Sequence, residues 1–178
     1  MQTHSSLKQE NLAVLKQGLE LLRGLDDDVY PHIKHPFSKY GIGSHLRHCL
    51  DFYHSFLEGV EGGRIDYDNR QRDESIETDR MVAISKILAT INSFEQLSEV
   101  DDQLPVLVRL EDCGDEKCPS TWSHSSVTRE LQALLSHTVH HYALIALMLQ
   151  LNGFEAPDEF GVAPSTLKRW RATASCAQ

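Results

Sequence analysis

Residues 131–149 read Leu-Gln-Ala-Leu-Leu-Ser-His-Thr-Val-His-His-Tyr-Ala-Leu-Ile-Ala-Leu-Met-Leu, an apolar run rich in helix-forming residues. Apolar side chains and two histidines recur in it at steps of three and four, which indicates a helix with one face turned toward a core. The residues expected on this inward face are Leu134, His137, His141, Leu144, Met148 and Leu151. We expect the helix to begin near Ser126 and to end at Asn152, because Gly153 suits the position that follows a helix.

The histidines of this helix are its most informative feature. His137 and His141 lie four residues apart, so their imidazoles would stand about one turn apart on the same face and could reach one metal ion. In a core position an unpaired imidazole is costly, so we expect a metal ion or a hydrogen-bond partner to satisfy each ring. His140 lies off this face, as a bystander or a support for the pair. Thr138 replaces the glutamate of the protease signature His-Glu-x-x-His, which disfavours a protease of that class.

Three further stretches, 5–25, 42–60 and 76–97, show apolar residues at helical spacing. A short final helix is expected within 160–170. Four helices of about 20 residues are typical of a four-helix bundle, in which metal sites are built from side chains on facing helices. The sequence therefore predicts an all-α fold, and its length is that of a single domain spanning residues 1–178.

The segments between these helices are read from their turn residues and from their alternation. Residues 104–110 alternate and are rich in β-branched side chains, and residues 121–126 could return beside them, so a short β-hairpin is predicted before the histidine helix. Residues 30–40, with two prolines and with His32 and His35, are predicted to form a loop at the surface. Residues 64–74 are expected to be a polar connector.

Composition excludes several partners. The formal net charge is −9 and the pI about 5.5, and Lys and Arg are scattered among acidic residues, so a nucleic-acid partner has no electrostatic support. No stretch reaches the roughly 18 apolar residues of a membrane span, and the first residues lack the apolar segment of a secretory signal. A cytoplasmic protein without a membrane partner is expected.

The four cysteines are less informative than the histidines. Cys49 falls within an apolar helical pattern and is expected to be a small core residue. Cys113 and Cys118, with His124 nearby, could suggest zinc, but no second cysteine pair exists and an ordinary exposed loop is favoured. Cys176 lies in a polar tail.

A metal site on the histidine helix needs a ligand from another helix. His45 and His48, three residues apart in the second helical stretch, both qualify. At about 100° per residue, His45 lies about 70° and His48 about 130° from the centre of the apolar stripe, so helix geometry alone favours His45.

Four motifs together resemble the DinB-like superfamily of metalloproteins, which includes bacillithiol-transferase-like members. They are Gly-Ile-Gly-Ser-His-Leu-Arg-His-Cys-Leu-Asp from residue 41, Ile-Asp-Tyr-Asp-Asn-Arg-Gln-Arg-Asp from 65, His-Thr-Val-His-His-Tyr-Ala from 137 and Phe-Gly-Val-Ala-Pro-Ser-Thr from 160. The resemblance implies an up-down-down-up four-helix bundle. It also implies a divalent metal held by one histidine of the second helix and by the pair His137 and His141. The family's helix-two ligand is followed three residues later by an acidic residue, which matches His48 and Asp51 and leaves His45 as a support or an alternative ligand.

Three neutral imidazoles would leave a metal at least one open position, which suits catalysis, and zinc or nickel suits such ligands. Glu130 and Asp51 could orient an imidazole or act as a base, or they could be exposed helix carboxylates. Arg70 and Arg72 could hold a substrate carboxylate, or they could be part of a solvated charge run.

For activity, the resemblance implies a thiol-dependent S-transferase, using a low-molecular-weight thiol, or a hydrolase acting on a small molecule. The alternative is a non-catalytic or stress-responsive bundle in which the metal is structural or the histidines are simply buried. A homodimer is expected in either case.

Overall fold

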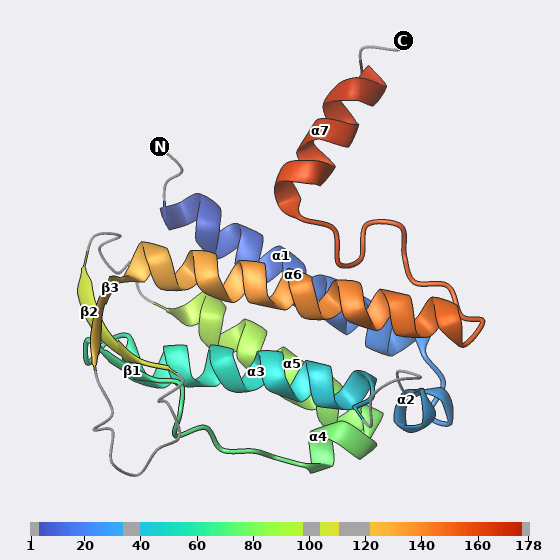
Figure 1. Cartoon of the computed structure of the whole chain (residues 1–178), viewed down its shortest axis with the longest axis horizontal. Helices are drawn as coiled ribbons and strands as arrows, with labels where there is room; N and C mark the ends of the chain where they lie inside the picture. The colour runs from blue at the N-terminus through green and yellow to red at the C-terminus, as the bar shows by residue number, and fades with distance from the viewer. Residues whose placement is uncertain (1–3, 34–39, 98–103, 111–121, 176–178) are drawn as a thin grey trace.

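The computed structural model describes residues 4–33, 40–97, 104–110 and 122–175, and its fold is mainly helical. The long helices in these ranges are α1 (His4–Gly24), α3 (Ile42–Gly59), α5 (Arg80–Gln96) and α6 (Val127–Leu151). They lie side by side, and α1 and α3 each pack against both α5 and α6 (Figure 1). Shorter helices are α2 (Val29–His32), α4 (Ser75–Thr78) and α7 (Pro164–Ser175), the last of which extends away from the long helices.

A buried asparagine ties three of the long helices together inside an otherwise apolar core. Asn11 of α1 is fully buried, and its amide donates to the carbonyl oxygens of Leu7 at 2.9 Å and of Leu131, on α6, at 3.1 Å. The hydroxyl of Tyr53, on α3, donates to the Asn11 side-chain oxygen at 2.8 Å. Because every polar atom of these two side chains has a partner, the contact adds specificity without leaving a buried group unsatisfied.

A small sheet closes one end of the helices. The predicted hairpin is confirmed as β2 (Pro105–Arg109) paired antiparallel with β3 (Ser123–Ser126). A further strand, β1 (Arg64–Asp66), pairs parallel with β2, so the segment expected to be a polar connector contributes to the sheet. Three residues are too few to show alternation, so β1 has no recognisable sequence pattern. β3 leads directly into α6, and Ser126 caps that helix by accepting from the Arg129 backbone N–H.

Two other expectations need correction. The predicted loop at 30–40 begins with a helical turn, α2, in which His32 is exposed, while His35 lies outside the described residues. The predicted continuous helix at 76–97 is broken at Asp79 into α4 and α5. The Asp79 backbone is extended there, and its carboxylate accepts from the backbone N–H groups of Met81 and Val82, which is the geometry of an N-cap.

The inward face of α6 is rotated by one residue from the predicted one. Leu134 and Met148 are buried as expected, but Leu151 is 56% exposed, and His137 and His141 are half-buried at the edge of the core. The other buried residues keep the helical spacing but lie one position later along the helix than the predicted face. They are Leu131, Leu135, Thr138, Tyr142, Ile145 and Leu149. The prediction missed this face because Thr138 and Tyr142 carry polar atoms and were not counted as apolar positions.

The core accommodates both of these residues. The Thr138 hydroxyl donates to the backbone carbonyl of Leu134, and the Tyr142 ring fits against Gly18, where an added Cβ would lie 2.0 Å from the tyrosine oxygen. Within the described ranges, no helix is both long and apolar enough to cross a membrane.

Candidate metal centre

Three histidines from two helices meet where α3 crosses the edge of α6. The His48 ring centre on α3 lies 4.8 Å from that of His137 and 4.9 Å from that of His141, and the two α6 rings are 4.5 Å apart. One nitrogen of each ring lies within 4.8 Å of a nitrogen of the other two. Each ring is half-buried. The structure thus brings together the three residues expected to ligate a metal.

The three imidazoles are neutral at pH 7. Burial lowers the pKa of His48 and of His137 to about 4 and that of His141 to about 3. The neighbouring imidazoles contribute to these lowered pKa values in all three rings, and the positive charge of Arg70 contributes for His48 and His137. A neutral imidazole carries one nitrogen lone pair that can bind a metal, so the protonation state suits ligation.

The hydrogen bonding of the rings also fits a cation. Nε2 of His137 lies 3.1 Å from Nε2 of His141. Nδ1 of His137 is buried and has no hydrogen-bond partner among the residues that the structure describes. Each neutral ring has one N–H donor and one nitrogen lone pair, and a divalent cation among the rings would bind the lone pair that each of the three rings offers.

His45 contacts this cluster from behind. Its Nδ1 lies 2.8 Å from Nδ1 of His141, on the side of that ring away from His137. A hydrogen bond there holds the orientation of the His141 ring, which is how groups behind a metal ligand usually act. Of the two α3 candidates, His48 therefore joins the group of three, and His45 supports it.

An aromatic wall, which the sequence analysis did not anticipate, borders the histidines. The Phe52 ring centre lies 4.4 Å from that of His137 and 5.0 Å from that of His48. Tyr67 stacks on Phe52, with their ring centres 5.0 Å apart. The guanidinium carbon of Arg70 lies 4.4 Å from the Phe52 ring centre. Phe52 could have been found from its position one turn after His48, whereas Tyr67 follows the short strand that the sequence did not reveal.

Glu130 is buried, with 6% of its surface exposed, so the exposed-carboxylate alternative is wrong for this residue. Its two oxygens accept from the hydroxyls of Tyr67, at 2.9 Å, and Ser125, at 2.5 Å. No hydrogen bond within the described chain joins Glu130 to an imidazole. Its contact with the centre therefore passes through Tyr67 and the Phe52 ring.

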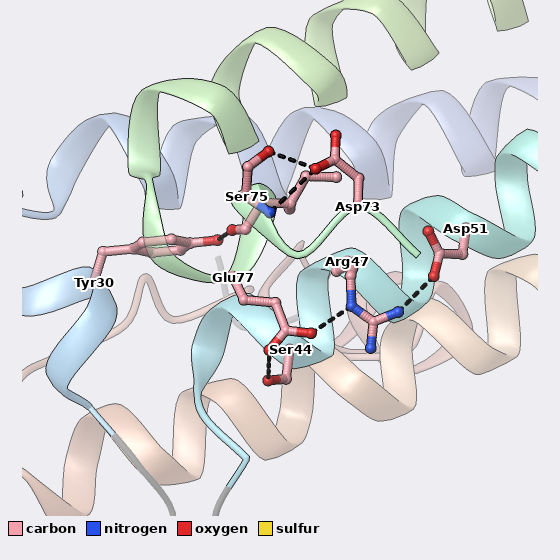
Figure 2. A network of polar contacts seen from close by, with 8 residues as sticks. Tyr30, Ser44, Arg47, Asp51, Asp73, Ser75 and Glu77 are labelled. Carbon is pink, nitrogen blue, oxygen red and sulfur yellow. Dashed lines mark hydrogen bonds and ion pairs between the residues drawn. The ribbon is translucent and has the colours of Figure 1, made fainter. Parts of the chain in front are cut away.

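Asp51 is also 6% exposed, and burial raises its pKa although Arg47 stands beside it. Arg47 donates to Asp51 at 2.7 Å and, through Nε, to Glu77 of α4 at 2.5 Å (Figure 2). Arg47 was missed in the sequence, although its spacing of four residues from Asp51 is that of a helical ion pair. Among the described residues, Asp51 makes no hydrogen bond to His48. Its contact with the polar network of α3 and α4 is the hydrogen bond from Arg47.

The same network holds α4 against α3, beside the turn that carries His45 and His48 (Figure 2). Ser44 donates to Glu77 at 2.7 Å, and the Tyr30 hydroxyl donates to the backbone carbonyl of Ile76 at 2.6 Å. Gly43 permits the close approach, because a Cβ there would lie 2.2 Å from the Glu77 carbonyl oxygen. The start of α3 is thus fixed by contacts that do not involve the histidines.

The remaining candidates lie outside the centre. Arg72 is exposed, and so is His140, whose ring centre is 5.4 Å from that of His141. Cys49 is buried, as expected for a core residue. Cys113, Cys118 and Cys176 lie outside the described residues. A shallow hollow of about 630 Å³ opens beside the centre and is lined by Arg129, Gln132, Ala133, Ser136, His137 and His140.

Comparisons with known proteins leave the family open. Over 106 residues, or 58% of its length, the chain is 36% identical to a protein named FK506-binding protein 5 from Rhizopus delemar. The matched region is 27% of the fungal protein, so the chain spans about a quarter of the length of this curated relative. No protein-family model matches the chain, and no solved structure matches it.

Proposed function

We propose that this protein is a metal-dependent enzyme of the DinB-like superfamily, and that His48, His137 and His141 hold a divalent cation, zinc or nickel. The proposed fold is the superfamily's up-down-down-up four-helix bundle, formed by α1, α3, α5 and α6. The proposed activity is a thiol-dependent S-transfer, or a hydrolysis, carried out on a small molecule.

One observation carries the proposal: three neutral imidazoles from two helices meet at the edge of the core, each half-buried. A structural metal is usually enclosed by four protein ligands, whereas three ligands beside a surface hollow leave room for a substrate. Imidazole nitrogen is a donor that zinc and nickel both accept, so the set of ligands is consistent with either metal.

A divalent cation held there would supply Lewis acidity, which lowers the pKa of a water or thiol that it binds. The protein's own residues have separate tasks. His45 orients the His141 ring through the Nδ1 contact at 2.8 Å. Phe52 and Tyr67 form an apolar wall that limits water on one side of the centre. In this proposal Glu130 and Asp51 position the centre through Tyr67 and Arg47, a role that fits their contacts better than that of a base.

A second candidate function is supported by the hydrogen bonds of His141. Its Nδ1 and Nε2 both lie within hydrogen-bond distance of other imidazoles, so this ring is satisfied without a metal. In this candidate the histidines form a hydrogen-bonded cluster without metal, within a non-catalytic or stress-responsive bundle. The low-molecular-weight thiol, the homodimer and the cytoplasmic location rest on sequence and resemblance and remain predictions under both candidates.

The deciding experiment is an S-conjugation assay with protein reconstituted with zinc or nickel. A panel of low-molecular-weight thiols is offered together with the electrophile monochlorobimane, and fluorescence reports the thioether formed. His48→Ala should abolish turnover, while His54→Ala should retain it, because His54 lies on the same helix and pairs with Glu58 outside the centre. A metal-loaded protein that forms no thioether with any of the thiols would contradict the proposed S-transfer and support the non-catalytic candidate.

A further inference from the structure

Arg70 stands beside the histidine centre with its hydrogen-bonding capacity unused. Its side chain is half-buried, and its guanidinium carbon lies 4.4 Å from the centre of the Phe52 ring. Within the residues that the structure describes, the guanidinium makes no hydrogen bond and no ion pair. A guanidinium has five N–H donors in a planar fork, and those of Arg70 are not taken up by any acceptor of the described chain, so they are available to a ligand. This arrangement suits a residue that binds an anionic ligand.

The position of Arg70 relates it to the centre. Both contact Phe52, whose ring centre lies 4.4 Å from the Arg70 guanidinium carbon and 4.4 Å from the ring centre of His137. Arg70 and His137 are therefore no more than twice that distance apart. The charge of Arg70 reaches the centre, because it lowers the pKa of both His48 and His137.

The neighbouring charges do not neutralise Arg70. Asp51 is the acidic group that acts on it most strongly, but its carboxylate is already bound by Arg47 at 2.7 Å. Asp68 acts on Arg70 more weakly, and Arg47 and Arg72 add positive charge on the same side. A divalent cation among the histidines would add further positive charge. The surroundings therefore favour an anionic ligand.

We propose that the site selects a small molecule with two groups: a thiolate that reaches the histidine centre and a carboxylate that pairs with the Arg70 fork. This inference rests on the proposed function and names its substrate class. Arg70 would act as the specificity residue. Arg72, which is exposed, would not take part. The thiol loses its proton to solvent on binding and the carboxylate is already ionised at pH 7, so no further reactant is required.

The test is calorimetric binding of two thiols to the cobalt(II)-loaded protein, with the thiolate charge-transfer band as a second readout. The probes are 3-mercaptopropionate, which has a carboxylate, and 2-mercaptoethanol, which does not. The wild type should bind 3-mercaptopropionate at least about tenfold more tightly, as expected for a charge-assisted bidentate pair. Arg70→Met should remove this preference by weakening the binding of 3-mercaptopropionate much more than that of 2-mercaptoethanol. Arg70→Lys should keep part of the preference.

Arg72→Met is the matched control and should behave as the wild type. Equal affinity for the two thiols in the wild type, or an unchanged preference in Arg70→Met, would overturn the role of Arg70 while leaving the metal centre intact. If neither thiol binds to the cobalt-loaded protein, the role of Arg70 is overturned as well. Failure of the protein to bind cobalt at all would instead refute the metal centre, and the role of Arg70 with it.

Discussion

Acid should destabilise the metal-free protein in a way that depends on its three clustered histidines. Their folded-state pKa values are about 4, 4 and 3, whereas an unfolded histidine titrates near 6.5. Between pH 6.5 and about 4, the unfolded chain binds protons that the folded chain does not. The free energy of unfolding therefore has its full contribution from these histidines above pH 6.5, and it decreases as the pH falls through this window.

The size of the effect follows from the number of protons. Near pH 5, each such histidine contributes a slope of at most about 1.4 kcal/mol per pH unit, and partial exposure of the rings reduces this to about 1 kcal/mol per pH unit. The metal-free protein should therefore lose about 3 kcal/mol per pH unit through the three rings. His137→Gln should lower the slope by about a third.

Urea unfolding, followed by circular dichroism at several pH values between 4.5 and 7, measures this slope. His54→Gln is the control, because this histidine lies on α3 outside the cluster, and its slope should match that of the wild type. A slope that is the same in His137→Gln as in the wild type would refute the reasoning. It would show that this imidazole does not become protonated on unfolding.

Three further substitutions test other contacts. His45→Ala should weaken zinc binding about 10- to 100-fold in a chelator competition without loss of helicity, because His141 loses its support; unchanged affinity would remove that role. Tyr53→Phe should lower the free energy of unfolding by about 1–3 kcal/mol in urea, since the Asn11 oxygen loses its buried donor; a change within error would contradict that contact. Asp79→Ala should cost about 1 kcal/mol through loss of the α5 cap, whereas Asp79→Asn should cost less.

The long helices were predictable because their apolar spacing is sustained over many turns. The bounds of α1, α3 and α6 lie within about two residues of those expected, which is the usual uncertainty of helix ends. The break at Asp79 was missed because apolar residues continue at helical spacing on both sides of it. An aspartate looks the same in a sequence whether it caps a helix or lies on its surface.

The candidate site was predictable in its residues but not in its surroundings. Only the family resemblance favours His48 over His45, since the apolar stripe of α3 favours His45. Both histidines of α3 contact the cluster, because it lies at the edge of the core: His48 is grouped with His137 and His141, and His45 lies against His141. The placement of Arg70 over Phe52 depends on how the chain after β1 returns to α3, which is a tertiary contact with no local signal.

Zinc titration against a chromophoric chelator tests the central claim most directly. The wild type should bind one zinc per chain, and His48→Ala, His137→Ala and His141→Ala should each lose that binding while remaining helical. His140→Ala, an exposed neighbour on α6, should retain it. Stoichiometric zinc in all three ligand variants, or none in the wild type, would contradict the assignment of a three-histidine metal centre.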